Sequence, residues 1–117
     1  MASTQFHESV ELLRPETQEM HRAIASLIEE LEAVDWYDQR IDATADSELA
    51  RILAHNRDEE KEHAAMVLEW IRRRDPAFDE QLRKILFRSG PIVGRENGPG
   101  AERRSLEIGS LREEATG

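Results

Sequence analysis

The sequence contains no cysteine, and this absence excludes several classes of chemistry. Disulfides, thiolate zinc sites, iron–sulfur clusters and thiol nucleophiles all require cysteine, so any bound metal must be held by oxygen and imidazole ligands. Aromatic residues are also scarce, at 5% of 117 residues, and 38% of residues are hydrophobic. Because this composition is thin for a self-sufficient core, we expect the chain to build a shared core by self-association.

The sequence also lacks features for binding membranes or nucleic acids. No apolar run approaches the roughly 20 residues that span a bilayer, and the N-terminus lacks the basic and apolar regions of a signal peptide. Acidic residues outnumber basic ones, 25 to 16, which gives a formal net charge of -9. This charge repels nucleic acid and attracts cations. We therefore expect a soluble, cytoplasmic protein with neither nucleic acid nor membrane as a partner.

Apolar periodicity predicts that the chain begins with a long helix. Apolar or small residues recur three and four positions apart from Val10 to Val34, which is typical of a helix with one buried stripe. Proline is favourable in a first helical turn but kinks a helix interior. The regular helix is therefore predicted from about Pro15 to Tyr37.

A second long helix is predicted after a short break in the stripe. Residues 38–45 interrupt the periodicity, and Thr44 or Asp46 can cap a helix over residues 46–74. A connection this short makes the two long helices antiparallel neighbours. The predicted fold class is thus all-α, built on a two-helix hairpin.

A short third helix and a tail complete the predicted organisation. Asp75 and Pro76 form a cap and a first-turn proline for a helix over residues 76–88. We predict that residues 1–90 form one helical domain, a half-bundle that dimerises into a four-helix bundle. Residues 91–117 combine glycine and proline with no sustained periodicity, which is typical of a flexible tail.

Polar side chains occupy positions of the second helix that should be apolar. Glu60 and His63 both lie on its apolar stripe, where a carboxylate is costly unless it is paired, protonated or bound to a cation. On the first helix, Glu30 lies beside the apolar stripe and can point into the same interface. Di-iron four-helix bundles take a Glu from each of two helices and a Glu-x-x-His from each of the other two.

This chain supplies one Glu and one Glu-x-x-His, which is half of that ligand set. A second identical chain, related by a two-fold axis, would supply the other half. The ligand types suit iron, because carboxylates neutralise charge and can bridge two ions, and imidazole adds a ligand that hard-cation sites seldom use. The pattern therefore predicts a di-iron centre at Glu30, Glu60 and His63, with two irons per chain pair.

The same residues have plainer interpretations. Glu-x-x-His occurs often by chance on charged helices, and Glu60 and His63 can hydrogen-bond across an interface to fix its register in a non-enzymatic assembly or adaptor. A divalent-metal buffer or sensor without turnover is a third hypothesis. Glu59, four residues before His63, is a weaker alternative partner for it. The position of Glu60 and His63 on an apolar stripe strengthens the metal hypothesis.

Further candidate residues lie near Glu30 on the first helix. Glu29 and Glu32 lie opposite the apolar stripe, with Trp36 four residues beyond Glu32. Their spacing alone favours an ordinary charged outer face, and the functional interpretation is an outer site through which cations pass. Tyr37, one helical repeat from Glu30, can hydrogen-bond a ligand carboxylate.

Two segments of the sequence closely resemble the encapsulated ferritin family. They are residues 28–40 (IEELEAVDWYDQR) and residues 54–66 (AHNRDEEKEHAAM), and the likeness covers residues 19–87. The resemblance implies a ferritin-like half-bundle that dimerises around a di-iron ferroxidase centre, with the dimers assembled into a ring-shaped homodecamer. It also implies oxidation of Fe2+ with oxygen or peroxide as acceptor, and iron storage inside an encapsulin nanocompartment.

The resemblance assigns roles to individual positions. By this likeness the functional residues are the iron ligands Glu30, Glu60 and His63, the outer metal site Glu29 and Glu32 beside Trp36, and Tyr37 close to the centre. All of these residue types match the family pattern. Pro15 departs from it, because a helix-compatible residue is expected there, and this departure does not touch the iron ligands.

The end of the chain resembles the peptide by which this family docks into the encapsulin shell. Residues 105–112 (SLEIGSLR) correspond to that peptide, and Glu107 departs from the pattern, where a small residue is common. Leu106, Ile108 and Leu111 would be the anchors of this peptide, and Gly109 would allow it to bend. The implied partners are therefore a second copy of the chain, the encapsulin shell protein and Fe2+ ions.

Overall fold

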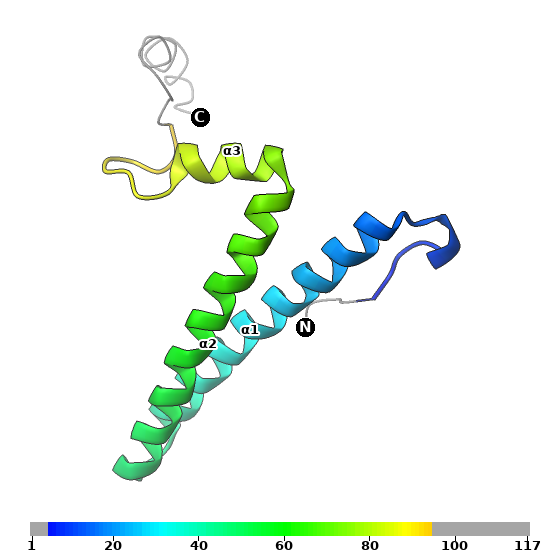
Figure 1. The fold of residues 1–117 in the computed structure, drawn as a ribbon. Coiled ribbons are helices and arrows are strands. Elements are labelled where there is room, and N and C mark those ends of the chain that lie inside the picture. The colour runs from blue at the N-terminus through cyan, green and yellow to red at the C-terminus, as the bar shows by residue number, and fades with distance from the viewer. Residues whose placement is uncertain (1–4, 95–117) are drawn as a thin grey trace. The chain divides into compact units, whose positions relative to one another are not determined.

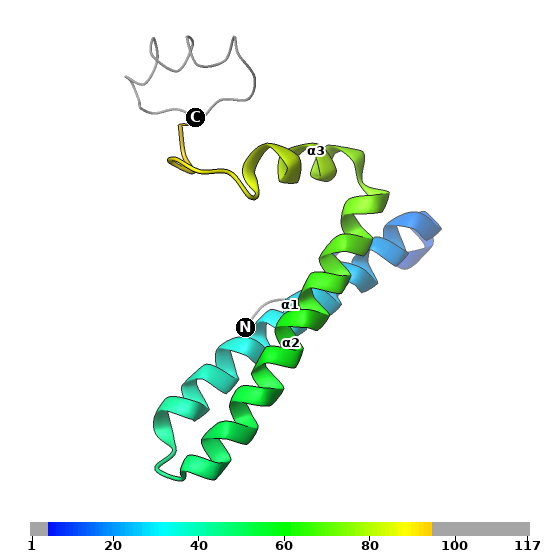
Figure 2. The same ribbon diagram turned by 60° about the vertical axis from the view of Figure 1, so that its left-hand side comes forward.

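A computed structural model describes residues 5–94, and every regular element among them is helical. The two long helices form an antiparallel hairpin, as Figures 1 and 2 show from two sides. The predicted all-α fold is confirmed. The predicted docking peptide, residues 105–112, lies outside the described residues. The elements are the 3₁₀ helix η1 (Val10–Leu12) and the α-helices α1 (Pro15–Ala43), α2 (Ser47–Arg74) and α3 (Pro76–Ile85).

The first long helix, α1, begins at Pro15, as the sequence predicts. Arg14 is held in an extended conformation, with φ -68° and ψ 152°, which is the conformation that a following proline favours. The proline ring presets the helical φ and removes a backbone N–H that would have no partner within the helix. The side-chain amide of Gln18 donates a hydrogen bond of 3.1 Å to the carbonyl of Leu13, which ties the preceding segment to this first turn.

The same helix ends at Ala43, so the predicted end at Tyr37 is too early. Residues 38–43 are mostly polar, but none of them is glycine or proline, and nothing in them stops a helix. Ile41, seven residues after Val34, is partly buried and continues the apolar stripe. The polar residues around it lie on the exposed face of α1.

A tight turn joins the two long helices and caps the second one. The side-chain hydroxyl of Thr44 accepts a hydrogen bond of 3.1 Å from the backbone N–H of Asp46. Asp46 in turn accepts a bond of 3.0 Å from the backbone N–H of Leu49, which satisfies a donor of the first turn of α2. Of the two predicted caps, Asp46 is therefore the N-cap of α2.

The third helix, α3, ends at Ile85 rather than at the predicted residue 88. Its final helical hydrogen bond runs from the backbone N–H of Leu86 to the carbonyl of Leu82, at 2.9 Å. Phe87 then takes a positive φ of 60°, a left-handed conformation that takes the chain out of the helix. Helical periodicity does not reveal this turn, because phenylalanine rarely adopts that conformation.

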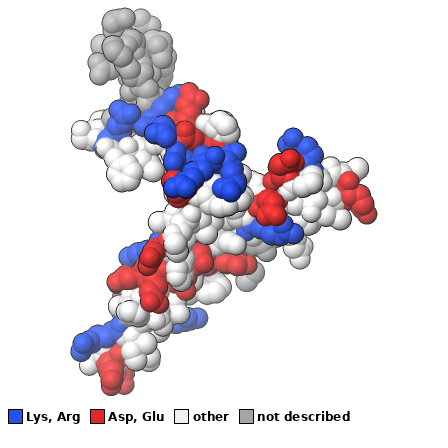
Figure 3. All heavy atoms as spheres, in the orientation of Figure 1, with Lys and Arg blue, Asp and Glu red and all other residues white. Residues whose placement is uncertain are grey.

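The chain divides into two compact units, Met1–Pro76 and Ala77–Gly117. The first unit contains the hairpin, along which acidic and basic side chains are interspersed (Figure 3). No helix in the described part of the chain has the length and apolarity needed to cross a membrane. The predicted division at residue 90 between a helical domain and a tail stays a prediction.

The hairpin buries very little of its apolar surface. Ala64 and Ile71 are its buried apolar side chains, with exposed fractions of 8% and 1%. Other apolar side chains of α1 and α2 remain about half exposed: Ile24, Leu31, Ile52 and Met66. Two helices cannot enclose an apolar core, because each covers only one side of the other. The hairpin therefore presents apolar surface that a further helical layer could cover.

Candidate metal centre

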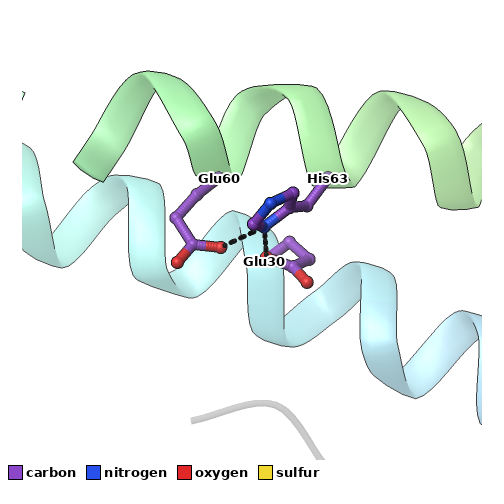
Figure 4. Close-up of side chains that lie close together, drawn as sticks. All are labelled: Glu30, Glu60 and His63. Carbon is purple, nitrogen blue, oxygen red and sulfur yellow. Dashed lines mark hydrogen bonds and ion pairs between the residues drawn. The ribbon is translucent and has the colours of Figure 1, made fainter. Parts of the chain in front are cut away.

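The hairpin brings together the three residues predicted as metal ligands. Glu30 projects from α1 and Glu60 and His63 from α2, and their side chains converge between the helices (Figure 4). His63 Nδ1 lies 3.3 Å from Glu60 Oε1 and 3.6 Å from Glu30 Oε1. The i, i+3 spacing places Glu60 and His63 on one face of α2, and the antiparallel pairing of the helices places Glu30 opposite them.

The three side chains remain partly accessible to solvent. The exposed fractions are 25% for Glu30, 24% for Glu60 and 45% for His63. The two carboxylates are thus mostly shielded from water, whereas the imidazole is the more open of the three. This partial exposure leaves the cluster accessible to a cation.

Two carboxyl groups that face each other shift the pKa values within the cluster. The pKa of Glu30 is raised, mainly by a hydrogen bond to Glu60 and then by burial and the repulsion of that carboxylate. The pKa of Glu60 is lowered, mainly because it accepts that hydrogen bond from Glu30. A hydrogen bond to Glu60 raises the pKa of His63. These shifts show that the carboxyl groups and the imidazole of the cluster influence one another's charge.

The donor set fits a divalent or trivalent transition metal. One ligand atom from each of the three residues lies within 4.8 Å of the others. Ligand atoms about 2.0–2.2 Å from a shared ion lie at most about 4.4 Å apart, so small side-chain rotations would close the set. Among the described residues, no lysine or arginine forms an ion pair with Glu30 or Glu60. The cluster therefore combines two carboxyl groups and one imidazole, without a lysine or arginine partner among the described residues.

The residues of the predicted outer site do not form a group of three ligands among the described residues of this chain. Glu29 and Trp36 are exposed on α1, and Glu32 is partly exposed. Within the part of the chain that the structure describes, Glu30, Glu60 and His63 are the one group of three acidic or histidine side chains close enough to share an ion. A metal at Glu29 and Glu32 would need further ligands, so this outer site stays a prediction.

Tyr37 is partly buried on α1, with the guanidinium of Arg40 5.6 Å above its ring. Among the described residues, no hydrogen bond joins it to Glu30, Glu60 or His63. Its predicted bond to a ligand carboxylate therefore stays a prediction.

The alternative pairing of Glu59 with His63 is not the one that the structure contains. Glu59 Oε2 lies 3.2 Å from Nε2 of His55, one turn earlier on the exposed face of α2. His63 faces Glu60 and Glu30 instead. The apolar stripe distinguished these two glutamates correctly.

An interhelical ion pair near the centre was missed by the sequence analysis. Arg57 of α2 donates from Nη1 to Oδ1 of Asp38 on α1 at 2.9 Å, and from Nε to Oδ1 of Asp58 at 3.2 Å. These bonds, first that to Asp38, raise the pKa of Arg57. Helical periodicity did not suggest this pair, because Asp38 falls in the segment where the helix was predicted to have ended.

Comparison with known proteins then decides the family. The model of the EncFtn-like family matches residues 5–89. The chain belongs to the EncFtn-like family. It is 54% identical over 129 residues to an encapsulated ferritin-like protein of Rhodospirillum rubrum, covering 97% of this chain and 92% of that protein. A ferritin-like protein of Thermotoga maritima is 48% identical over 107 residues, which cover 90% of this chain and 94% of that protein.

Two further relatives support the EncFtn-like assignment. An encapsulin nanocompartment cargo protein, EncC, of Myxococcus xanthus is 44% identical over 72 residues, or 61% of this chain and 55% of that protein. The crystal structure of a Nitrosomonas europaea protein matches with a TM-score of 0.73 and 64% identity, covering 74% of this chain and 96% of that chain. The resemblance to encapsulated ferritins is therefore confirmed, and so is the helical fold.

Proposed function

We propose that this EncFtn-like protein is a ferroxidase, in which two identical chains together bind Fe(II) and oxidise it to Fe(III). The observation that carries the proposal is the convergence of Glu30, Glu60 and His63 between α1 and α2 in a chain of this family. Iron is the substrate, and oxygen or a peroxide is the electron acceptor. The oxidised iron is then available for storage.

A two-fold pairing of chains supports a centre for two irons. Each chain offers two carboxylates and one imidazole, which is half of the ligand set of a di-iron bundle. Partly exposed apolar side chains on the same hairpin offer a surface for the second chain. Two irons held together allow one acceptor to take two electrons at one place. Because the chain has no cysteine, iron itself would supply the redox chemistry.

The chain's own residues would control iron binding through charge and protons. Glu30 and Glu60 would offset the charge of the cation, and His63 would bind through a neutral nitrogen. The pKa values of Glu30 and His63 are both raised, so protons compete with a cation for these two groups more strongly than they would at isolated side chains. Iron binding would therefore release protons and strengthen as the pH rises.

The names of two relatives suggest where the protein acts. The Rhodospirillum rubrum relative is called encapsulated, and the Myxococcus xanthus relative is called a nanocompartment cargo protein. We extend this to the present chain and propose that it is cargo of an encapsulin shell, docked through residues 105–112. The ring-shaped decamer and the outer site at Glu29 and Glu32 belong to the same proposal.

Iron oxidation by point variants tests the ferroxidase proposal. Replacing Glu30, Glu60 or His63 by alanine should each abolish rapid Fe(II) oxidation. Glu62→Ala, which removes an exposed glutamate between the two α2 ligands, should leave the rate unchanged. Unchanged rates in all three ligand variants would defeat the proposal.

Native mass spectrometry tests the stoichiometry independently. Two irons per chain pair are expected, and one or none would contradict a symmetric centre. If the chains assemble without metal and are indifferent to chelators and inactive towards iron, the non-enzymatic alternative holds. In that case the contacts of His63 with Glu30 and Glu60 serve only to align the helices.

Truncation tests the proposed docking peptide. Removal of residues 105–117 should abolish loading into the encapsulin shell and leave Fe(II) oxidation largely intact. Co-expression with the shell protein, followed by purification of intact shells, measures the cargo that remains. Normal loading of the truncated chain would show that docking depends on other residues.

A further inference from the structure

The ion pair between Asp38 and Arg57 joins the helices close to the candidate metal centre. Arg57 is largely shielded, with 25% of its side chain exposed, and it bonds Asp38 across the hairpin at 2.9 Å. Asp58, the next residue on α2, accepts a further bond of 3.2 Å from Nε of the same guanidinium. Two carboxylates thus fix one arginine, so its orientation is better defined than that of a typical surface arginine.

Arg57 lies on the same helix as two of the three ligands and close to them. It precedes Glu60 by three residues, which corresponds to about 4.5 Å along α2 and places both on neighbouring parts of one face. Its partner Asp38 lies on the same helix as Glu30, eight residues further on, or about 12 Å along α1. The pair therefore connects the two helices that must align for the ligands to meet.

The ligands themselves do not hold this alignment well in the absence of a cation. Glu30 and Glu60 are both acidic, and their side chains meet across the hairpin. His63 Nδ1 lies 3.3 Å from Glu60 and 3.6 Å from Glu30, and 45% of the His63 side chain is exposed, so these contacts constrain the register of the helices only weakly. An alignment that does not depend on the ligands must come from contacts elsewhere on the hairpin.

We propose that Arg57, held by Asp38, is a positioning residue for the metal centre. It sets the register and rotation of α2 against α1, so that Glu60 and His63 meet Glu30 before a cation arrives. Ligands arranged in advance cost less conformational entropy when the metal binds. This inference rests on the proposed metal-binding function and concerns the same centre.

The charge of Arg57 has the opposite effect, and this makes the inference testable. A positive charge near a cation site weakens cation binding through repulsion, so its removal alone should tighten binding. Loss of a negative charge at Asp38 should weaken binding for the same electrostatic reason. If the pair acts by positioning the ligands, both changes weaken binding. The direction of the effect at Arg57 therefore distinguishes the two mechanisms.

The experiment measures Co(II) binding to the full-length chain by calorimetry, because Co(II) is a divalent ion that does not turn over. Arg57→Gln and Asp38→Asn should each weaken binding by about three- to five-fold, the scale of a well-formed surface ion pair. Arg57→Lys, which keeps the charge but not the planar fork, should lie between wild type and Arg57→Gln. The double variant should bind no worse than the weaker single variant.

Arg51→Gln is the matched control. It removes an exposed arginine from the same helix and changes the net charge by the same amount, so its affinity should stay close to wild type. Thermal unfolding of each variant, followed by circular dichroism, ensures that binding is measured on folded protein. If Arg57→Gln does not fold, Arg57→Lys and Asp38→Asn decide the question.

The following results would overturn the inference. Tighter or unchanged Co(II) binding by Arg57→Gln would mean that its charge dominates or that its position is irrelevant. A lower unfolding temperature with unchanged affinity would assign the pair to stability alone. If Glu60→Gln binds Co(II) as wild type does, the proposed metal centre itself fails. Loss of binding in Glu60→Gln without weakening in Arg57→Gln would defeat only the positioning role.

Discussion

Two glutamates on α2, Glu60 and Glu69, share a helix and differ in how their charge is satisfied. Glu69 accepts bonds of 2.8 Å from Nε and Nη2 of Arg72, and one of 2.6 Å from Nε of Arg73. These two guanidinium groups lower the pKa of Glu69 to about 2. Glu60 instead faces the carboxyl group of Glu30 and the imidazole of His63.

This difference separates a candidate metal ligand from a carboxylate that is already neutralised within the hairpin. Both glutamates have a basic partner three residues later, so spacing does not separate them. Arginine carries a permanent charge, whereas histidine is charged only when protonated and can offer a free nitrogen. Glu69 already has its cation built into the helix. Glu60 has a second carboxylate instead, and a bound metal ion would supply the positive charge that its surroundings lack.

The largest expected effect comes from replacing each of the two glutamates by glutamine and comparing the rates of Fe(II) oxidation. Glu60→Gln should lower the initial rate of Fe(II) oxidation by at least about 100-fold, because ligand loss should exceed the 10- to 100-fold effects seen for groups that only orient ligands. Glu69→Gln should change the rate by less than about twofold, because its arginines lie outside the centre. Absorbance of the Fe(III) product measures both rates. Equal losses in the two variants would refute the distinction.

A second prediction concerns a variant in which Glu60 has an arginine partner, as Glu69 has. His63→Arg places an arginine three residues after Glu60, in the spacing of Glu69 and Arg72. We expect Co(II) binding at the centre to be lost, because a fixed cation replaces a neutral ligand and occupies both carboxylates. The metal-free unfolding temperature should not fall, because the facing carboxylates gain a permanent counter-charge.

His55→Arg provides the control for this replacement. His55 pairs with Glu59 on the exposed face of the same helix, so an arginine there adds the same charge away from the centre. Its Co(II) affinity should stay close to wild type. Comparable loss of binding in both variants would mean that added charge, rather than the change of partner at Glu60, is responsible.

The candidate centre could largely be predicted from sequence, because it depends on helical periodicity. Glu60 and His63 were noticed as polar residues on an apolar stripe, and the short connection implied that Glu30 would lie opposite them. The starts of α1 and α2 were also predictable, because Pro15 and Asp46 act through local backbone chemistry.

The features that escaped prediction depend on contacts or backbone choices that periodicity does not encode. Polar residues at the end of α1 hid its continuation to Ala43, since an exposed helical turn and a loop can have similar composition. The positive φ of Phe87, which ends α3, has no local sequence signal. The pair of Arg57 with Asp38 requires the rotation of one helix against the other, which neither helix specifies alone.

The end of α2 that carries Glu69 also holds the best-buried side chain of the hairpin, which predicts a loss of stability without a loss of binding. Ile71 is 1% exposed, so Ile71→Ala should lower the free energy of unfolding by about 2–5 kcal/mol. Ile71→Val, which removes one methylene group, should cost about 0.5–1.5 kcal/mol. Denaturant unfolding measures both. Co(II) affinity of the folded variants should be unchanged, and a parallel loss of affinity would mean that the two ends of the hairpin are coupled.

The smallest expected effect concerns the acid stability contributed by Glu69. Its pKa is lowered from 4.5 to about 2 in the folded chain, so the charged carboxylate favours folding. This contribution is complete above pH 4.5 and is lost as the pH falls towards 2. The difference in denaturation midpoint between wild type and Glu69→Gln should therefore be largest near neutral pH and vanish in acid. Added salt should reduce it, because the group is partly exposed and its ion pairs are screened.

Glu62→Gln, without such partners among the described residues, should show no comparable pH-dependent difference. If the difference in denaturation midpoint between wild type and Glu69→Gln stays constant across this pH range, the ion pairs of Glu69 with Arg72 and Arg73 do not stabilise the helix. Glu69 would then differ from Glu60 only in position.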